Sequence, residues 1–234
     1  MTVARKRDKA MKPILRYLPL AAMLVAATAS ADDTPVEQSL LAIQHQWAHI
    51  NYQLPADKQA KAFAALDQQE QALIKRHPKQ AGPLIWHGII LSSLAGAKGG
   101  LGALHLAKEA RNQLEASLKI DPNALQGSAD ASLGTLYYKV PGWPLGFGDD
   151  KKAEAYLKKA LQIDPDGVVA NYFYADFLYG QGRYQQALKV ARKALKAPAR
   201  PDRPLADKGR HQEVVALLAK IRHKIGPTAS ATRE

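Results

Sequence analysis

The sequence predicts an all-α protein built from antiparallel helix pairs that stack on one another. A motif that ends a helix occurs twice, as ASLKIDPNA (116–124) and KALQIDPDG (159–167), at an offset of 43 residues. An apolar segment precedes each copy, and a further pair of such segments follows downstream. Self-similarity at a period of this size is typical of proteins made of stacked helical units.

The first thirty-one residues differ from the rest in composition. Basic residues gather at 5–16, an apolar run follows at 18–28, and Ala-Ser-Ala at 29–31 has the pattern that signal peptidase cuts. A membrane anchor needs about 20 continuous apolar residues, and this run is shorter. We therefore expect a signal peptide at 1–31, with Met11 as an alternative start, and a periplasmic mature protein without a membrane span.

Charge and cysteine content narrow the class of partner. The chain has no cysteine, so neither a disulfide nor a lipid-modified cysteine is expected. Without residues 1–31 it holds 27 basic and 20 acidic residues, or +7, and 13 of the basic residues lie in 183–234. An anionic lipid surface or an acidic protein would suit this basic segment, and a solvated helix face is the simpler explanation. No nucleic-acid-binding motif accompanies it, so nucleic acid is not an expected partner.

Small residues recur at matching positions in the pairs and predict where the two helices cross. They would let the helices approach closely. The positions are Gly88, Gly134 and Ala175 on the first helices, and Ala110, Ala153 and Ala187 on the second. Proline at 122 and 165 ends two of the second helices, because the residue before a proline avoids the helical conformation. A weaker copy at 65–73 predicts one more pair near the N-terminus.

The segment ANYFYADFLYGQGRYQQALKVARKAL (170–195) resembles a tetratricopeptide repeat (TPR). The positions that match the family pattern are Gly182, Tyr184, Ala187, Ala191, Ala194 and Leu195. The resemblance covers roughly residues 35–198 and implies a right-handed superhelix whose first helices line a concave groove. Repeat spacings of 43 to 46 residues exceed the 34 of the family, so we expect the extra residues in turns, around 96–102 and 140–150.

The long inserts, the export signal and the 140–150 sequence are similar to those of a narrower group. This is the periplasmic TPR-like T-component family associated with tripartite ATP-independent periplasmic (TRAP) transporters. The similarity implies a binding or adaptor protein.

Three sets of residues with i, i+4, i+7 spacing predict the face that lines the groove. The sets are Ile85, Ile89 and Ser92; Ala131, Thr135 and Tyr138; and Tyr172, Asp176 and Tyr179. Ile89 and the three tyrosines, with Ser92, Thr135 and Asp176 as polar points, would suit a peptide or an elongated apolar ligand. The alternative is that the inserts partly cover these aromatic side chains. Trp143 and Phe147 in the second insert are costly to expose, so we expect them to fold onto their own helix pair or to roof the groove.

Other candidate sites have simpler explanations. The glycine-rich segment 96–102 lacks the preceding strand and the Gly-Lys-Ser/Thr end of a phosphate-binding loop. We expect it to be a flexible connection between two helices. His45 and His49 lack a third ligand at metal spacing and read as surface histidines. Asp150, of the acidic pair at 149–150, is expected to cap a helix over 151–163 rather than to bind calcium.

The last segment predicts a capping helix over 205–225, which would cover the final apolar face of the array, and a disordered tail over 226–234. Its apolar stripe comprises Val214, Leu217, Leu218, Ile221 and Ile225. The repeat domain is thus expected at 32–225.

We expect a non-enzymatic TPR-type scaffold that holds a protein segment or an elongated ligand in its groove, with no cofactor, metal or catalytic residue. An accessory ligand-binding component of a TRAP-type uptake system is the alternative, and assembly of like subunits is a third. A hydrolase with a spatially assembled triad is a further alternative.

Overall fold

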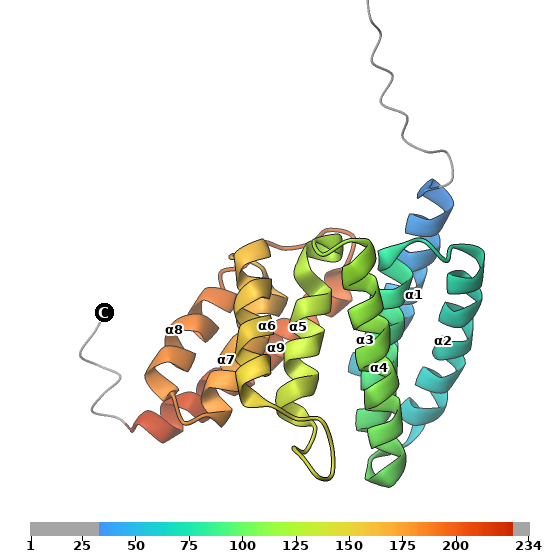
Figure 1. Ribbon diagram of the computed structural model, residues 1–234. Coiled ribbons are helices and arrows are strands. Elements are labelled where there is room, and N and C mark those ends of the chain that lie inside the picture. The colour runs from blue at the N-terminus through green and yellow to red at the C-terminus, as the bar shows by residue number, and fades with distance from the viewer. Residues whose placement is uncertain (1–32, 227–234) are drawn as a thin grey trace, which may run out of the picture. The chain divides into compact units, whose positions relative to one another are not determined.

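The computed structural model of the chain describes residues 33–226. These residues form nine helices and no strand, which confirms the all-α prediction. The helices are α1 (Asp33–Gln53), α2 (Ala56–Arg76), α3 (Ala81–Lys98), α4 (Gly100–Ile120), α5 (Ala124–Lys139), α6 (Asp150–Ile163), α7 (Val168–Gly180), α8 (Tyr184–Ala194) and α9 (Pro204–Ile225). The first eight form four pairs that pack one after another, and Figure 1 shows the pairs α3–α4 and α5–α6 side by side. The signal peptide predicted at 1–31 and the tail beyond Gly226 lie outside the described residues.

Glycine allows the two helices of a pair to come close. A Cβ atom added to Gly88 of α3 would lie 2.5 Å from Leu114 Cγ of α4, and one added to Gly134 of α5 would lie 2.6 Å from Leu157 Cγ of α6. These distances are shorter than any Cβ contact tolerates, so only glycine fits at either crossing. The prediction of small residues at the crossings is confirmed.

The extra residues of the first insert lengthen helices instead of forming a loop. Helix α3 continues to Lys98 and α4 begins at Gly100, so the expectation of a flexible connection at 96–102 was wrong. The chain reverses at Gly99 and Gly100, whose φ angles of +61° and +63° favour glycine. The surrounding alanines and leucines are strong helix formers and no proline interrupts them, so the helices extend up to this point.

The second insert is a loop, as expected, between α5 and α6. The Gly148 amide donates to the Pro141 carbonyl at 2.9 Å, and the Asp149 amide donates to the Tyr137 carbonyl at 2.9 Å. The side chain of Asp149 accepts from the amides of Lys151 and Lys152, so it caps α6. The prediction that Asp150 is the cap was wrong by one residue, because Asp149 is the last residue with extended backbone and Asp150 is already helical.

Helix α9 does more than cap the last pair. Its apolar stripe from Val214 to Ile221 is buried, as predicted, and it packs against α8 and α7. The prediction of a capping helix is confirmed, and α9 in addition packs against α1 at the other end of the repeat array. Figure 1 shows α9 passing behind α5 and α6. Because consecutive first helices also touch, α1, α3, α5, α7 and α9 form a closed series around an inner surface.

Candidate partner-binding site

The predicted groove residues lie on the first helices, and most of them are partly buried. Ile85 and Ala131 belong to the buried core, whereas Ile89, Tyr138, Tyr172 and Tyr179 are half-buried and pack against it. The structure therefore leaves most of the predicted stripe partly exposed on the first helices. What binds there stays a prediction.

A polar contact joins two of the predicted groove residues. The hydroxyl of Tyr138 in α5 donates to Asp176 Oδ2 of α7 at 2.6 Å, and Lys139 Nζ lies 2.8 Å from the same oxygen. Burial raises the pKa of Tyr138, and the adjacent carboxylate adds to the effect, so the phenol stays protonated as the donor. Asp176 is thus engaged within the protein.

The two predicted hydroxyl groups are also engaged. Ser92 donates to the Gly88 carbonyl at 2.7 Å, and Thr135 donates to the Ala131 carbonyl at 2.8 Å, each within its own helix. Only the acceptor lone pairs of these hydroxyls stay free for a partner.

Arg210 of α9 is buried against α7. Its guanidinium carbon lies 4.6 Å from the centroid of the Tyr172 ring and 4.7 Å from that of Phe173, both on α7. Nη1 of Arg210 donates to Glu213, one turn further along α9. Burial raises the pKa of Tyr172 to about 12, and the Glu213 carboxylate adds to this shift. An arginine stacked on two rings and paired with a carboxylate is the favourable way to bury this cation.

Gly209 fixes the distance between α9 and α1. A Cβ atom at this position would lie 2.4 Å from the ring of Tyr52, so only glycine fits against the tyrosine. Tyr52 also stacks edge-on against Trp47 at 5.8 Å between ring centroids. The side chain that covers Tyr172 of the predicted groove thus comes from α9, whereas the sequence suggested that the inserts would cover the groove.

One end of the inner surface stays open. A pocket of about 530 Å³ lies among the α4–α5, α6–α7 and α8–α9 connections and the walls of α1 and α3. Its lining consists of Gln44, Trp86, Leu125, Gln126, Ser128, Ala131, Asp164, Gly167, Val168, Val169, Ala170 and residues 198–203. The volume is in the usual range for ligand sites.

Arg203 is the pocket residue with an unused donor. Its guanidinium carbon lies 5.1 Å from the Trp86 ring centroid, and its Nε is buried without a hydrogen-bond partner. Burial and the neighbouring Arg200 lower the pKa of Arg203 to about 10, so it stays charged at neutral pH. Asp164 and Asp202 also face the pocket, which is therefore mixed in charge.

The backbone beside this pocket adopts a rare conformation. Leu125 and Gln126 have φ angles of +48° and +54°, in the left-handed region that side chains other than glycine rarely adopt. On the facing wall, the N-cap of α7 is Gly167, which has no side chain to cap the first turn, and the Asp164 carboxylate accepts from the Gly167 amide. Backbone strain of this kind often accompanies binding sites, and free amides at a helix start can donate to a ligand.

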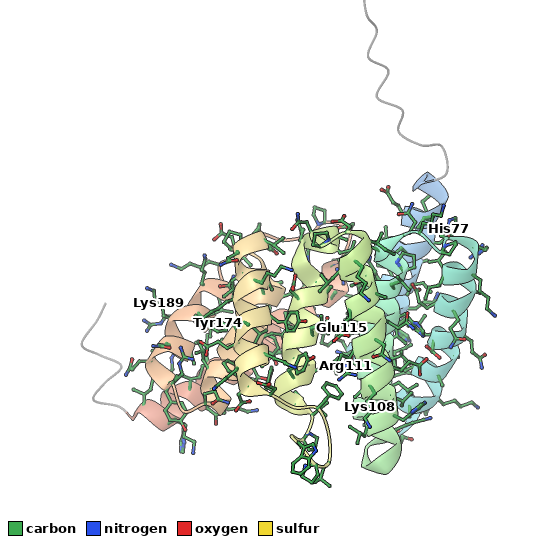
Figure 2. The ribbon with its side chains drawn as sticks, in the orientation of Figure 1. His77, Lys108, Arg111, Glu115, Tyr174 and Lys189 are labelled. Carbon is green, nitrogen blue, oxygen red and sulfur yellow. The ribbon has the colours of Figure 1, made fainter. Side chains whose placement is uncertain are left out.

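The two aromatic residues of the α5–α6 loop behave differently. Phe147 folds back, as expected: its ring stacks edge-on against Tyr137 at 5.5 Å, and Arg111 of α4 lies over it at 4.5 Å. Figure 2 shows Arg111 in the space between α4 and α5, above the loop. Trp143 does neither of the things expected of it, because its side chain is 90% exposed. The prediction for Trp143 was wrong.

The remaining candidates keep their simpler roles. His45 contacts the Asp202 carbonyl at 2.6 Å, and His49 contacts Gln53 on its own helix. Among residues 33–226, no three His, Asp or Glu side chains converge as metal ligands would. Within the same range, no helix has the length and apolar character needed to cross a bilayer.

Sequence reasoning did not identify Arg210, Glu213, Tyr52 or Arg203 as site residues. A signal for Arg210 was present, since it lies four residues before Val214 and thus continues the buried stripe of α9. Arg203 carried no such signal, because it lies in an irregular connection.

Comparisons with known proteins agree with this architecture. The family model described as tetratricopeptide repeat matches residues 145–221. A thermophilic TPR protein of Thermus thermophilus, TTC0263, is 19% identical, with 80% of this chain and 100% of that chain aligned at a TM-score of 0.51. A crystal structure of MamA is 17% identical, with 74% of this chain and 95% of that chain aligned at a TM-score of 0.42. A search of curated proteins returned no match.

The repeat match and the helix-pair architecture lead to the same conclusion by separate routes. The match covers α6 to α9, and the structural likeness extends over most of the chain. Residues 145–221 match the tetratricopeptide repeat, and the described chain has the fold of a TPR protein.

Proposed function

We propose that this protein is an exported, non-enzymatic TPR-type scaffold that holds a protein segment or an elongated ligand in the pocket at the open end of its inner surface. The repeat fold supports the class of function. The observation that selects the place is the position of α9, which packs against α1 and α7 and sets Arg210 over Tyr172 of the predicted groove, while a pocket remains beside the α8–α9 connection.

A partner that displaced α9 would have to overcome a large loss of apolar contacts. Four large side chains of the helix are almost fully buried: Val214, Leu217, Leu218 and Ile221. Burial of each contributes about 1.5 to 3 kcal/mol, so exposing all four would cost about 6 to 12 kcal/mol. That is of the order of the whole stability of a domain. Entry at the open end needs no such displacement.

The chemistry of the pocket suits a segment with both apolar and acceptor groups. Val168, Pro198 and the Trp86 ring provide apolar wall, and Arg203 Nε provides an unused donor. The uncapped first turn of α7 adds backbone donors. An extended peptide that brings a carboxylate or carbonyl oxygen to Arg203 would satisfy this donor, which otherwise stays buried and unpaired.

Capture of partners from a periplasmic extract by the immobilised protein tests the pocket. Ser128→Trp would fill it and Arg203→Gln would remove its unpaired charge. Lys196→Gln is the matched control, because Lys196 is exposed in the same connection and does not line the pocket. Both pocket variants should reduce the captured protein, quantified by mass spectrometry, by at least about tenfold. Undiminished capture by both would refute the pocket as the binding site.

Export rests on residues 1–31 and has its own test. N-terminal sequencing of the protein from a periplasmic fraction should give Asp32 as the first residue. Recovery of the chain with residues 1–31 attached, in the cytoplasmic fraction only, would contradict the periplasmic assignment.

A further inference from the structure

We propose that the edge carrying the α5–α6 loop docks on an anionic lipid bilayer, with Trp143 and Leu145 inserted at the membrane surface. This inference concerns the opposite ends of the helices from the pocket, and it does not depend on what the pocket binds.

The loop presents two large apolar side chains to solvent. Trp143 is 90% exposed and Leu145 is 72% exposed, with Pro144 between them. The other two tryptophans, Trp47 and Trp86, are 7% and 3% exposed. Exposed apolar side chains that lie next to each other mark a contact surface.

The loop holds this tip in place. The Gly146 amide donates to the Gly142 carbonyl at 3.0 Å, and the Gly148 amide to the Pro141 carbonyl at 2.9 Å. Phe147, directly behind the tip, lies between Tyr137 and Arg111. The tip is therefore ordered before it meets a partner, so little conformational entropy is lost on contact.

The edge around the tip carries an excess of positive charge. The connections from a first to a second helix, with the adjoining helical turns, contain six basic residues: Lys58, Lys98, Lys139, Lys151, Lys152 and Arg183. They contain three acidic residues: Asp57, Asp149 and Asp150. Asp149 is bound to the amide groups at the start of α6, whereas Lys139 and Arg183 are paired with Asp176 and Glu154 just beyond these turns. The positive charge offered to solvent therefore comes from Lys58, Lys98, Lys151 and Lys152, which are exposed. An anionic surface is the complement of this edge.

The small area of the exposed tip favours a lipid surface over a protein as its partner. A stable protein interface buries about 800 Å² on each partner, whereas one aromatic side chain buries at most about 250 Å². Trp143 and Leu145 are too small to form such an interface alone. A bilayer needs no matching shape, and tryptophan favours the membrane–water interface.

Tryptophan fluorescence in the presence of lipid vesicles tests the proposal. Because Trp143 is the exposed tryptophan of the described chain, its emission should shift to shorter wavelength on vesicles containing phosphatidylglycerol, and less on phosphatidylcholine alone. Sedimentation with the same vesicles gives the affinity. Trp143→Ala should weaken binding by at least about tenfold, whereas Ile120→Ala, a control 44% exposed at the far end of α4, should not.

Charge removal supplies a second readout. The double variant Lys98→Gln and Lys151→Gln should lose about fivefold in affinity per charge on anionic vesicles, and added salt should have a similar effect. Arg203→Gln should bind vesicles normally, which separates this surface from the pocket. Absence of any fluorescence shift, or equal binding by the Trp143 and Ile120 variants, would overturn the proposal and favour a protein as the partner of the tip.

Discussion

The guanidinium of Arg210 in α9 lies over the ring of Tyr172 in α7, 4.6 Å from its centroid. Tyr172 is one of the residues that the repeat pattern assigns to the partner-binding groove. The position that a partner was expected to fill is thus filled by the chain itself. This contact decides how the inner surface can be used.

Replacing Arg210 by alanine should lower the free energy of unfolding by about 2 to 3 kcal/mol. The change removes the stacking on Tyr172 and Phe173 and leaves the half-buried Glu213 without its cation. Urea unfolding followed by circular dichroism measures the loss. Arg222→Ala, at an exposed position of the same helix, should change stability by less than about 0.5 kcal/mol. Equal effects of the two variants would show that Arg210 does not hold α9.

Two glycine-to-alanine substitutions should have opposite effects on the stability of the protein. At Gly134 a Cβ atom would lie 2.6 Å from Leu157 Cγ and 3.1 Å from the Ala153 carbonyl oxygen, so overpacking should cost about 1 to 3 kcal/mol. At Gly96, in α3, nothing lies within 4 Å, so alanine should stabilise the helix by up to about 1 kcal/mol. Thermal unfolding compares the two. Stabilisation by Gly134→Ala would contradict the close crossing of α5 and α6.

Glu70 should make the protein less stable as pH rises. Its carboxyl is fully buried without a partner, and burial, with a smaller effect of Asp67, raises its pKa from 4.5 to about 8. Between these values the folded chain keeps a proton that the unfolded chain releases. Stability should therefore fall across this window, by at most about 4 to 5 kcal/mol from this group.

The Glu70→Gln variant isolates the effect of Glu70 on the pH dependence of stability. The nearby titratable pair, Asp67 of α2 and His87 of α3, is present in both proteins and therefore contributes equally to both. Urea unfolding from pH 5 to pH 8 should show a flatter dependence for the variant. The control Glu37→Gln, at an exposed position of α1, should show the same slope of stability against pH as the parent protein. If the stability of the parent and that of the variant changed equally with pH, the raised pKa of Glu70 would be ruled out.

The two aromatic residues of the α5–α6 loop should differ in their effect on stability. Phe147→Ala removes the contacts with Tyr137 and Arg111 and should cost about 2 kcal/mol, less than for a fully buried ring. Trp143→Ala should change stability by less than about 0.5 kcal/mol, because the side chain is 90% exposed. Circular dichroism is the suitable probe, since the second change alters the fluorescence. A large loss in the Trp143 variant would mean that the ring packs on the protein.

Local signals in the sequence were sufficient for most of the architecture. The glycines at 88 and 134 predicted the helix crossings, because a close crossing requires a small residue and such a residue can be recognised in the sequence. The apolar stripe of α9 from Val214 to Ile221 marked a buried helix face for the same reason. The glycines at 96–102 led to a wrong prediction of a loop, because only Gly99 and Gly100 form the turn, whereas Gly96 and Gly102 lie inside α3 and α4.

The sequence by itself determined the helix pairs, their order and the residues where they touch, since these depend on periodicity and on the size of single side chains. Only the tertiary structure decided that α9 lies against both α7 and α1, that Arg210 covers Tyr172, and that Trp143 points into solvent. Each of these depends on distances between segments far apart in the chain. Such distances follow from the packing of all the helices together, which no local pattern records.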